Sequence, residues 1–218
     1  MKVLKVLVFA ACLVPLILLA WDGYAGNLGA NPIETITRST GSWTLIFLFI
    51  TLGVTPLRRL FGWNHVIKFR RMLGLFAFFY ACLHFTTYFW LDQFFDLRAI
   101  VKDVVKRPFI TVGFTSFVLL IPLAATSTAG MIRRLGKRWQ QLHRLIYISA
   151  IGGVLHFLWL VKADTRRPLI YGSLVALLLG YRIVVKCCLG EIVPVKKTSL
   201  APAVMDPNRH IMPEKDLS

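Results

Sequence analysis

The sequence predicts an all-α polytopic membrane protein, a six-helix transmembrane bundle with both termini in the cytoplasm. The first reason is composition: 56% of the 218 residues are hydrophobic, 17% are charged and the mean hydropathy is +0.65. A soluble domain of this length would be far less apolar. The second reason is the presence of six apolar runs of the length needed to cross a bilayer. The third is the placement of the basic residues, which cluster between these runs.

The six expected spans divide the chain into a transmembrane domain, residues 1–187, and a cytoplasmic tail rich in proline and charge, residues 188–218. The spans are expected near 3–21, 41–57, 72–91, 109–127, 143–161 and 168–187. The first run also has features of a cleaved signal peptide, but it is long and lacks a clean A-x-A site. The connections are too short for a soluble catalytic domain, and no internal repeat is evident.

The distribution of charge sets the expected orientation. With the N-terminus in the cytoplasm, the inner side holds 18 of the 26 basic residues and four acids, while the outer side holds eight bases and six acids. The resulting net charges are +14 and +2, so the positive-inside rule places both termini in the cytoplasm. Anionic membrane lipid, and no nucleic acid, is then the expected partner of the basic excess.

The polar residues within the spans are the best guide to function, because burying them in hydrocarbon is costly. The expected spans contain no Asp or Glu, which argues against a proton pump or a cation-coupled transporter. They do contain histidines. His84 lies 14 residues after Arg70, and His156 lies 13 after His143, a separation of about 20 Å along each helix. Because both helices run outward, His84 and His156 share an outer level, and Arg70 and His143 share an inner one.

Two facing histidines at one depth are what bis-imidazole ligation of a haem iron requires. On the third helix, the small residues Gly74, Ala77 and Ala81 fall close to the line that joins Arg70 to His84, and we expect them to form a trough for a flat macrocycle. On the fifth helix, an ideal geometry would leave His143 and His156 about 140° apart. We therefore expect a kink or π-bulge at residues 152–153, where two glycines are adjacent.

Simpler interpretations of these residues remain open. An intramembrane histidine also serves as a hydrogen-bonding group between helices, and His143 could be a polar cap at the membrane boundary. Arg70 is either a base whose side chain extends to the inner surface or a partner for a haem propionate.

Several segments together resemble the MsrQ (also called YedZ) family, haem-bearing membrane subunits with a ferric reductase-like transmembrane domain. The segments are LGANPIETITRSTG at 28–41, TPLRR at 55–59, FRRMLGL at 69–75, LH at 83–84, RPFITVGFTS at 107–116, ATST at 125–128 and GKRWQQLHRLIY at 136–147. The tail after about residue 190 has no clear counterpart in that family.

The resemblance implies a b-type cytochrome in the bacterial inner membrane, with one or two haems. Such a subunit carries electrons from quinol, or from a cytosolic flavin reductase, to a periplasmic molybdopterin partner that reduces methionine sulfoxide in oxidised proteins. It has no substrate-reducing site of its own. By position, His84 and His156 match the outer haem, whereas His143 and Arg70 match an inner site. FMN is implied by the resemblance alone.

Two other functions fit the same residues. A stand-alone ferric or oxygen-reducing oxidoreductase would usually need a cytoplasmic NAD(P)H-flavin domain, which is absent here unless another chain supplies it. A non-redox scaffold or small transporter would use the histidines only to join helices. The loop expected at 92–108, with mixed charge, is either a docking surface for the partner or simply a solvated loop.

Overall fold

The computed structural model describes residues 2–161 and 165–190, and within them the chain is helical, with no β-strand. Six helical segments are long and apolar enough to cross a membrane, which confirms the predicted all-α, six-helix bundle, while the cytoplasmic placement of its termini stays a prediction. They are α1 (Lys2–Tyr24), α2 (Pro32–Phe61), α3 (Arg70–Thr86) continued by the π-helical η2 (Thr87–Asp92), α5 (Pro108–Ala125), α7 and α8 (Lys137–Leu142 and Leu145–Leu160), and α9 (Arg166–Gly190). Three short helices complete the described chain: η1 (Asn64–Lys68), α4 (Leu97–Lys106) and α6 (Ala129–Leu135). Most of the predicted tail lies outside the described residues.

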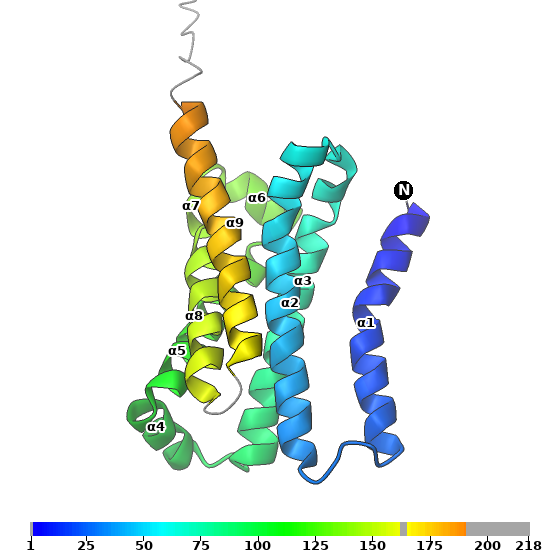
Figure 1. Cartoon of the computed structure of the whole chain (residues 1–218), viewed down its shortest axis with the longest axis vertical. Coiled ribbons are helices and arrows are strands. Elements are labelled where there is room, and N and C mark those ends of the chain that lie inside the picture. Colours follow the sequence, from blue (N-terminus) through cyan, green and yellow to red (C-terminus); the bar gives the residue numbers. More distant parts are fainter. Residues whose placement is uncertain (1, 162–164, 191–218) are drawn as a thin grey trace, which may run out of the picture.

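Figure 1 shows how the spans are arranged. α2 and α3 form one antiparallel pair, α5 and α8 form a second, and α9 packs against α8 and α2. The N-terminal end of α1 and the C-terminal end of α9 lie on the same side, at the top of Figure 1, as an even number of spans requires. α6 and α7 also lie at this end, which is the side predicted to be cytoplasmic, and α4 lies across the opposite end.

α2 begins nine residues before the start predicted for the second span, at Pro32 instead of 41. The reason is local: the Asn31 side chain caps the helix by accepting a hydrogen bond from the Glu34 backbone N–H at 3.2 Å, and Pro32 occupies the first turn. Gly62, with φ of 67°, ends the helix in a left-handed conformation. Thirty residues span about 45 Å, so α2 exceeds a hydrocarbon core of about 30 Å.

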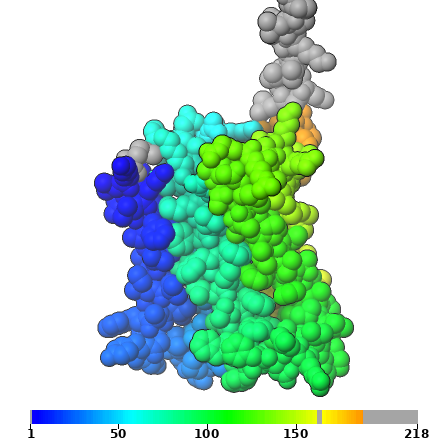
Figure 2. All heavy atoms as spheres, turned by 180° about the vertical axis from the view of Figure 1, so that it is seen from behind, coloured from blue at the N-terminus to red at the C-terminus, as the bar shows by residue number. Residues whose placement is uncertain are grey.

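α1 packs more loosely than the other spans and lies at the edge of the bundle (Figures 1 and 2). The face of α1 that is turned toward the bundle contacts α3, and two of these contacts are specific. The Phe9 and Phe76 rings meet edge to face at 5.1 Å, and the buried Tyr80 hydroxyl donates a hydrogen bond of 2.9 Å to the Cys12 carbonyl. Much of the remaining surface of α1 is exposed apolar side chain, as expected for contact with lipid.

The predicted trough on the third helix is wrong in part. Ala77 is fully buried in the core, and a Cβ at Gly74 would lie 3.6 Å from the Thr51 methyl group of α2. These two small residues therefore sit in the packed core, where Gly74 allows α2 to approach α3 closely, and only Ala81 of the three lines a cavity.

The irregularity predicted at residues 152–153 is also wrong, because α8 is regular through both glycines. The helix is interrupted at the other end, where His143 ends α7 and Arg144 precedes α8. This break changes the angular relation between His143 and His156 that an ideal helix would impose. A π-helical stretch does occur, but in the third span, where it begins at Thr87, three residues after His84.

Candidate functional site

A cavity of about 560 Å³ lies between the two helix pairs, in the half of the bundle nearest α4. Its walls come from α2, α3, α5 and α8, with η2 and α4 at one end. This end is called the outer end, because the charge distribution predicts that it faces away from the cytoplasm. The middle of the cavity is lined mainly by apolar side chains, among them Leu45, Phe85 and Phe117. The volume is within the range of roughly 300–1,000 Å³ that is typical of pockets for small molecules and cofactors.

The structure brings His84 and His156 together in this cavity, as predicted from their depth. The His84 Nδ1 lies 2.9 Å from the Thr37 carbonyl of α2, and the His156 Nδ1 lies 2.7 Å from the Phe109 carbonyl of α5. A carbonyl oxygen can only accept, so each Nδ1 carries the proton. The Nε2 of each neutral imidazole is then left with a free lone pair, the form in which histidine binds a metal.

The two rings are also at a separation that suits a shared metal. Their centroids are 6.2 Å apart, and their planes are inclined by 75°. Two metal–imidazole bonds of about 2 Å each, together with the two ring radii, give roughly 6 Å between centroids. A metal ion between the rings therefore fits the observed spacing.

A glycine on the facing helix makes room for each histidine. A Cβ at Gly41 would lie 3.0 Å from the His84 Cε1, and a Cβ at Gly113 would lie 2.6 Å from the His156 Nδ1. The second separation is shorter than real Cβ contacts allow. Both glycines lie four residues after the carbonyl that holds the ring, so one turn of α2 and one turn of α5 each orient a histidine.

The two helix pairs repeat the same arrangement with a shift of 72 residues. The prediction that no internal repeat is evident therefore needs correction at the level of the site, where three of six paired residues are identical, although most paired residues along the rest of α2 and α5 differ in type. Equivalent positions line the cavity on both sides: Thr37 and Phe109, Gly41 and Gly113, Thr44 and Ser116, Leu48 and Leu120, Ala81 and Gly153, and His84 and His156. α2 and α5 run in the same direction (Figure 1), and the paired residues His84 and His156 meet in one cavity, so the two helix pairs are related approximately by a half-turn about an axis along the length of the bundle.

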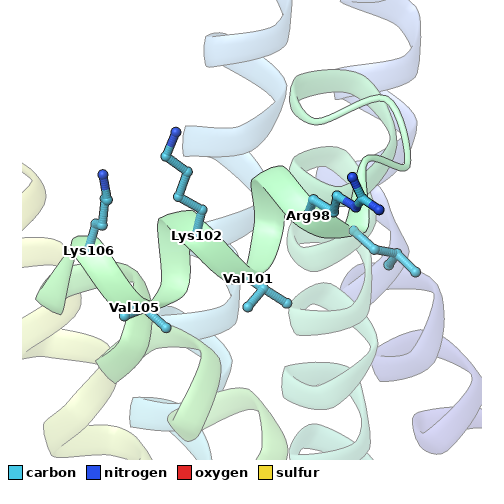
Figure 3. A pocket seen from close by; sticks show the side chains of 6 residues that line it. Arg98, Val101, Lys102, Val105 and Lys106 are labelled. Carbon is cyan, nitrogen blue, oxygen red and sulfur yellow. The ribbon is translucent and has the colours of Figure 1, made fainter.

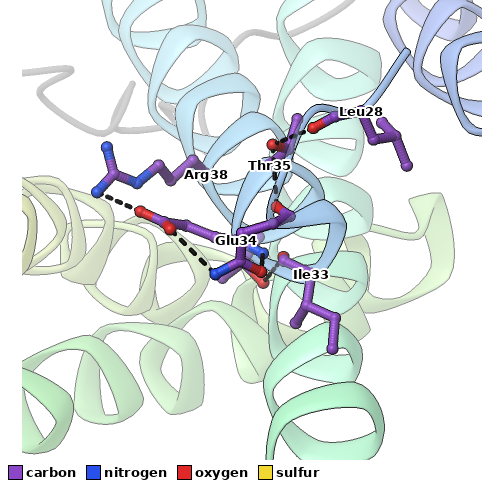
Figure 4. A network of polar contacts seen from close by, with 7 residues as sticks. Leu28, Ile33, Glu34, Thr35 and Arg38 are labelled. Atoms are coloured by element: carbon purple, nitrogen blue, oxygen red, sulfur yellow. Dashed lines mark hydrogen bonds and ion pairs between the residues drawn. The ribbon is translucent and has the colours of Figure 1, made fainter. Parts of the chain in front are cut away.

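The outer end of the cavity is polar and was not predicted as part of the site. Arg38, Arg107 and the Tyr88 hydroxyl line it, and that buried hydroxyl has no hydrogen-bond partner among the described residues. The Arg38 Nη2 forms an ion pair of 2.5 Å with the Glu34 Oε1 (Figure 4). The Arg107 Nε lies 3.5 Å from the Asp103 Oδ1, which makes a second ion pair. Both pairs are partly exposed, so the two guanidinium groups remain available to an anionic ligand.

The predicted inner residues lie at the other end of the bundle and do not line the cavity. The His143 ring stacks on Trp139 with centroids 3.8 Å apart, and its Nδ1 donates to the Trp139 carbonyl at 3.1 Å. Arg70, at the start of α3, is close enough to act electrostatically on His143. Within the described residues, no second histidine joins them.

Arg182 of α9, one of the 18 bases predicted to lie on the inner side, connects three helices in that half of the bundle. Pro56 has no N–H, so the Leu52 carbonyl one turn earlier lacks its helical donor. Arg182 supplies the missing donor at 2.7 Å and also donates to the Tyr147 hydroxyl of α8. One side chain thus connects α2, α8 and α9.

Comparison with known proteins identifies the class first. Residues 37–154 match the family described as ferric reductase like transmembrane component, which is more than half of the chain. The matched region contains His84 and His143, and His156 lies two residues beyond it.

The relatives narrow the class further. The protein-methionine-sulfoxide reductase heme-binding subunit MsrQ of Herminiimonas arsenicoxydans is 60% identical over 186 residues, covering 84% of this chain and 85% of that protein. Proteins of the same name from Rhodospirillum rubrum and Azospira oryzae are 55% and 52% identical over 181 and 200 residues, covering 83% and 91% of this chain and 87% and 86% of theirs. The chain therefore belongs to the MsrQ family of ferric reductase-like membrane proteins. No solved structure matches it significantly.

Proposed function

We propose that this chain is the haem-carrying, electron-transferring membrane subunit of a methionine-sulfoxide reductase system. The observation that carries the proposal is the pair formed by His84 and His156, each held by a backbone carbonyl, with ring centroids 6.2 Å apart in one cavity. The relatives bear the name heme-binding subunit, which fits this pair. The sequence has no C-x-x-C pair for covalent attachment, which argues against a c-type haem, and the family resemblance then favours the b type.

The rest of the cavity also fits a haem. Its apolar middle suits the macrocycle, and its outer end offers Arg38, Arg107 and the unpartnered Tyr88 hydroxyl to the two propionates. A bound haem supplies a one-electron couple at its iron. The chain's own residues fix the imidazole orientations through the Thr37 and Phe109 carbonyls, and the apolar walls exclude water.

Electrons would enter from the cytoplasmic side and leave at the outer end of the cavity. The donor would be quinol or a cytosolic flavin reductase, and the acceptor the periplasmic molybdopterin subunit that reduces methionine sulfoxide. The relatives' names support the link to that reductase. The bias of basic residues supports an inner-membrane orientation with both termini in the cytoplasm. FMN stays a prediction of the family resemblance.

An inner redox centre at Arg70 and His143 is a further part of the proposal. The His143 Nδ1 donates to the Trp139 carbonyl, and the Leu123 carbonyl also lies close to the ring, so Nε2 is the nitrogen that would bind the redox group. Arg70 supplies a positive charge for a propionate or another anionic group. A second haem at this level would take its other axial ligand from a group that is not a histidine of the described residues, and the proposal therefore covers one haem or two.

The test is a reduced-minus-oxidised absorption spectrum of the purified protein, with haem counted per chain. We expect His84→Ala and His156→Ala to abolish the outer haem, and His143→Ala to spare it. His65→Ala serves as the matched control, since His65 is exposed in η1. Full haem content in His84→Ala protein would refute the ligand assignment. Colourless wild-type protein under haem supply would favour a scaffold, and electron uptake without any methionine-sulfoxide reductase would favour a stand-alone oxidoreductase.

A further inference from the structure

The segment predicted as the loop 92–108 contains a helix, α4, that lies across the outer end of the bundle (Figure 1). The Asp96 side chain begins it by accepting hydrogen bonds from the Arg98 and Ala99 backbone N–H groups at 2.9 and 3.1 Å. One stripe of α4 faces inward: Ile100 is buried, and Ile100 and Val104 form part of the cavity wall. The position of α4 therefore shapes the candidate haem site.

A second stripe of α4 is apolar and uncovered. Leu97, Val101 and Val105 follow one another at one-turn spacing and are 64%, 63% and 78% exposed. The chain that leads into α4 adds three exposed aromatic side chains, Trp90, Phe94 and Phe95, at 56%, 77% and 57%. Aromatic residues in this position are typical of the membrane–water interface.

A third stripe is basic. Arg98, Lys102 and Lys106 also recur at one-turn spacing, about 100° around the helix from the exposed aliphatic stripe. Figure 3 shows Lys102 and Lys106 extending to one side of α4, with Val101 and Val105 on the other. The nearby acids are engaged elsewhere, since Asp96 caps the helix and Asp103 pairs with Arg107. Among the described residues, no acid forms an ion pair with this basic stripe.

We propose that α4 is an interfacial helix that binds the anionic lipid of the outer leaflet. Its exposed aliphatic stripe would lie at the boundary of the acyl chains, and its three basic side chains would contact lipid phosphates. The order of the stripes favours lipid over a soluble protein partner. The aliphatic stripe lies between the bundle-facing stripe and the basic stripe, so it faces the membrane that surrounds the bundle and not the aqueous side. Bound lipid would thereby hold α4 in position, and with it the part of the cavity wall formed by Ile100 and Val104.

The test uses the full chain, reconstituted in vesicles, with a fluorescent label on a single cysteine. In a background in which the four native cysteines are replaced by alanine, Val101→Cys carries the label, and Asn27→Cys, in an exposed turn on the same side, is the control. Two kinds of vesicle are compared: a mixture of phosphatidylglycerol with phosphatidylcholine, and phosphatidylcholine alone. In each, the fluorescence of the label is quenched either by brominated acyl chains or by aqueous iodide. We expect the label at 101 to be quenched mainly by the brominated lipid, and the label at 27 mainly by iodide.

Charge reversal separates the lipid charge from simple apolar contact. Each basic residue near an anionic surface strengthens attachment by roughly fivefold, so Arg98→Glu, Lys102→Glu and Lys106→Glu together should expose the label at 101 to iodide in the anionic vesicles. The milder glutamine variants, which remove charge without reversing it, should give a smaller change of the same sign.

The proposal would be overturned if iodide quenched the label at position 101 equally in both kinds of vesicle. It would also be overturned if charge reversal left the iodide quenching of that label unchanged in the anionic vesicles. Protection that arises only when the soluble reductase is added would assign the surface to a protein partner instead. The readout does not depend on haem. A protein without haem but with a lipid-protected label would contradict the proposed function and leave the lipid proposal intact.

Discussion

The glycine beside each histidine gives the sharpest test of the site, and Gly113→Ala is the stronger of the two variants. A Cβ at position 113 would lie 2.6 Å from the His156 Nδ1, whereas ordinary contacts lie near 3.5 Å. The ring would have to move by about 1 Å, which would stretch its 2.7 Å hydrogen bond to the Phe109 carbonyl beyond the normal range. At Gly41 the closest approach is 3.0 Å, so His84 needs to shift only about half as far.

Crowding of this kind costs about 1–3 kcal/mol, and loss of the hydrogen bond adds about 1 kcal/mol. Together these would weaken haem binding roughly 30- to 1,000-fold in Gly113→Ala, with a smaller effect in Gly41→Ala. The assay is haem per chain during titration of the haem-free protein, with the absorption spectrum as a record of axial ligation.

Gly53→Ala is the control, because a Cβ there meets nothing within 4 Å and alanine favours the helix. If Gly113→Ala bound haem as tightly as Gly53→Ala, with an unchanged spectrum, the packing of His156 against α5 would not determine its role as a ligand.

Three further predictions follow from other contacts. Arg38→Gln or Arg107→Gln should lower the haem midpoint potential by a few tens of millivolts in a redox titration, because a nearby cation favours the reduced iron; an unchanged potential would place the propionates elsewhere. Tyr80→Phe should lower the free energy of unfolding by about 1 kcal/mol, because it removes the hydrogen bond from the Tyr80 hydroxyl to the Cys12 carbonyl. The haem content of this variant should be unaffected, and loss of haem would contradict a purely structural role for Tyr80. Arg182→Leu should cost about 1–3 kcal/mol in denaturant unfolding, since it leaves the Leu52 carbonyl without a donor, and stability equal to wild type would refute that bridge.

The architecture and the histidine pair were predictable from sequence because both depend on one-dimensional quantities. Span length follows from bilayer thickness, and the depth of His84 and His156 follows from helical rise. Their meeting in one cavity needed only the additional assumption that the third and fifth spans are neighbours with aligned inner ends.

The parts that were missed depend on which helices touch. The Thr37 and Phe109 carbonyls cannot be distinguished in sequence from other backbone groups, and their role appears only when α2 packs on α3 and α5 on α8. Gly74 is predicted to line the cofactor trough because it lies on the same helix face as His84. A small residue on that face leaves room either for a cofactor or for a neighbouring helix, and here it is the helix α2. Arg38 falls outside the span predicted at 41–57, because the sequence pattern did not reveal the cap at Asn31 that starts the helix earlier. The equal spacing of Gly41 to His84 and of Gly113 to His156 was present in the sequence and could have revealed the repeat.

The shift of 72 residues between the two helix pairs bears on how a b-type haem would be oriented in the cavity. The two edges of a b-type haem differ only in the order of their vinyl and methyl groups, so a half-turn about the axis between the propionates exchanges its faces. Here each face would meet an equivalent set of positions, such as Gly41 and Gly113, and the polar end with Arg38 and Arg107 would be unaffected by the half-turn. Both rotational isomers should therefore be populated in comparable amounts, and paramagnetic NMR of the oxidised protein would show two sets of haem methyl resonances.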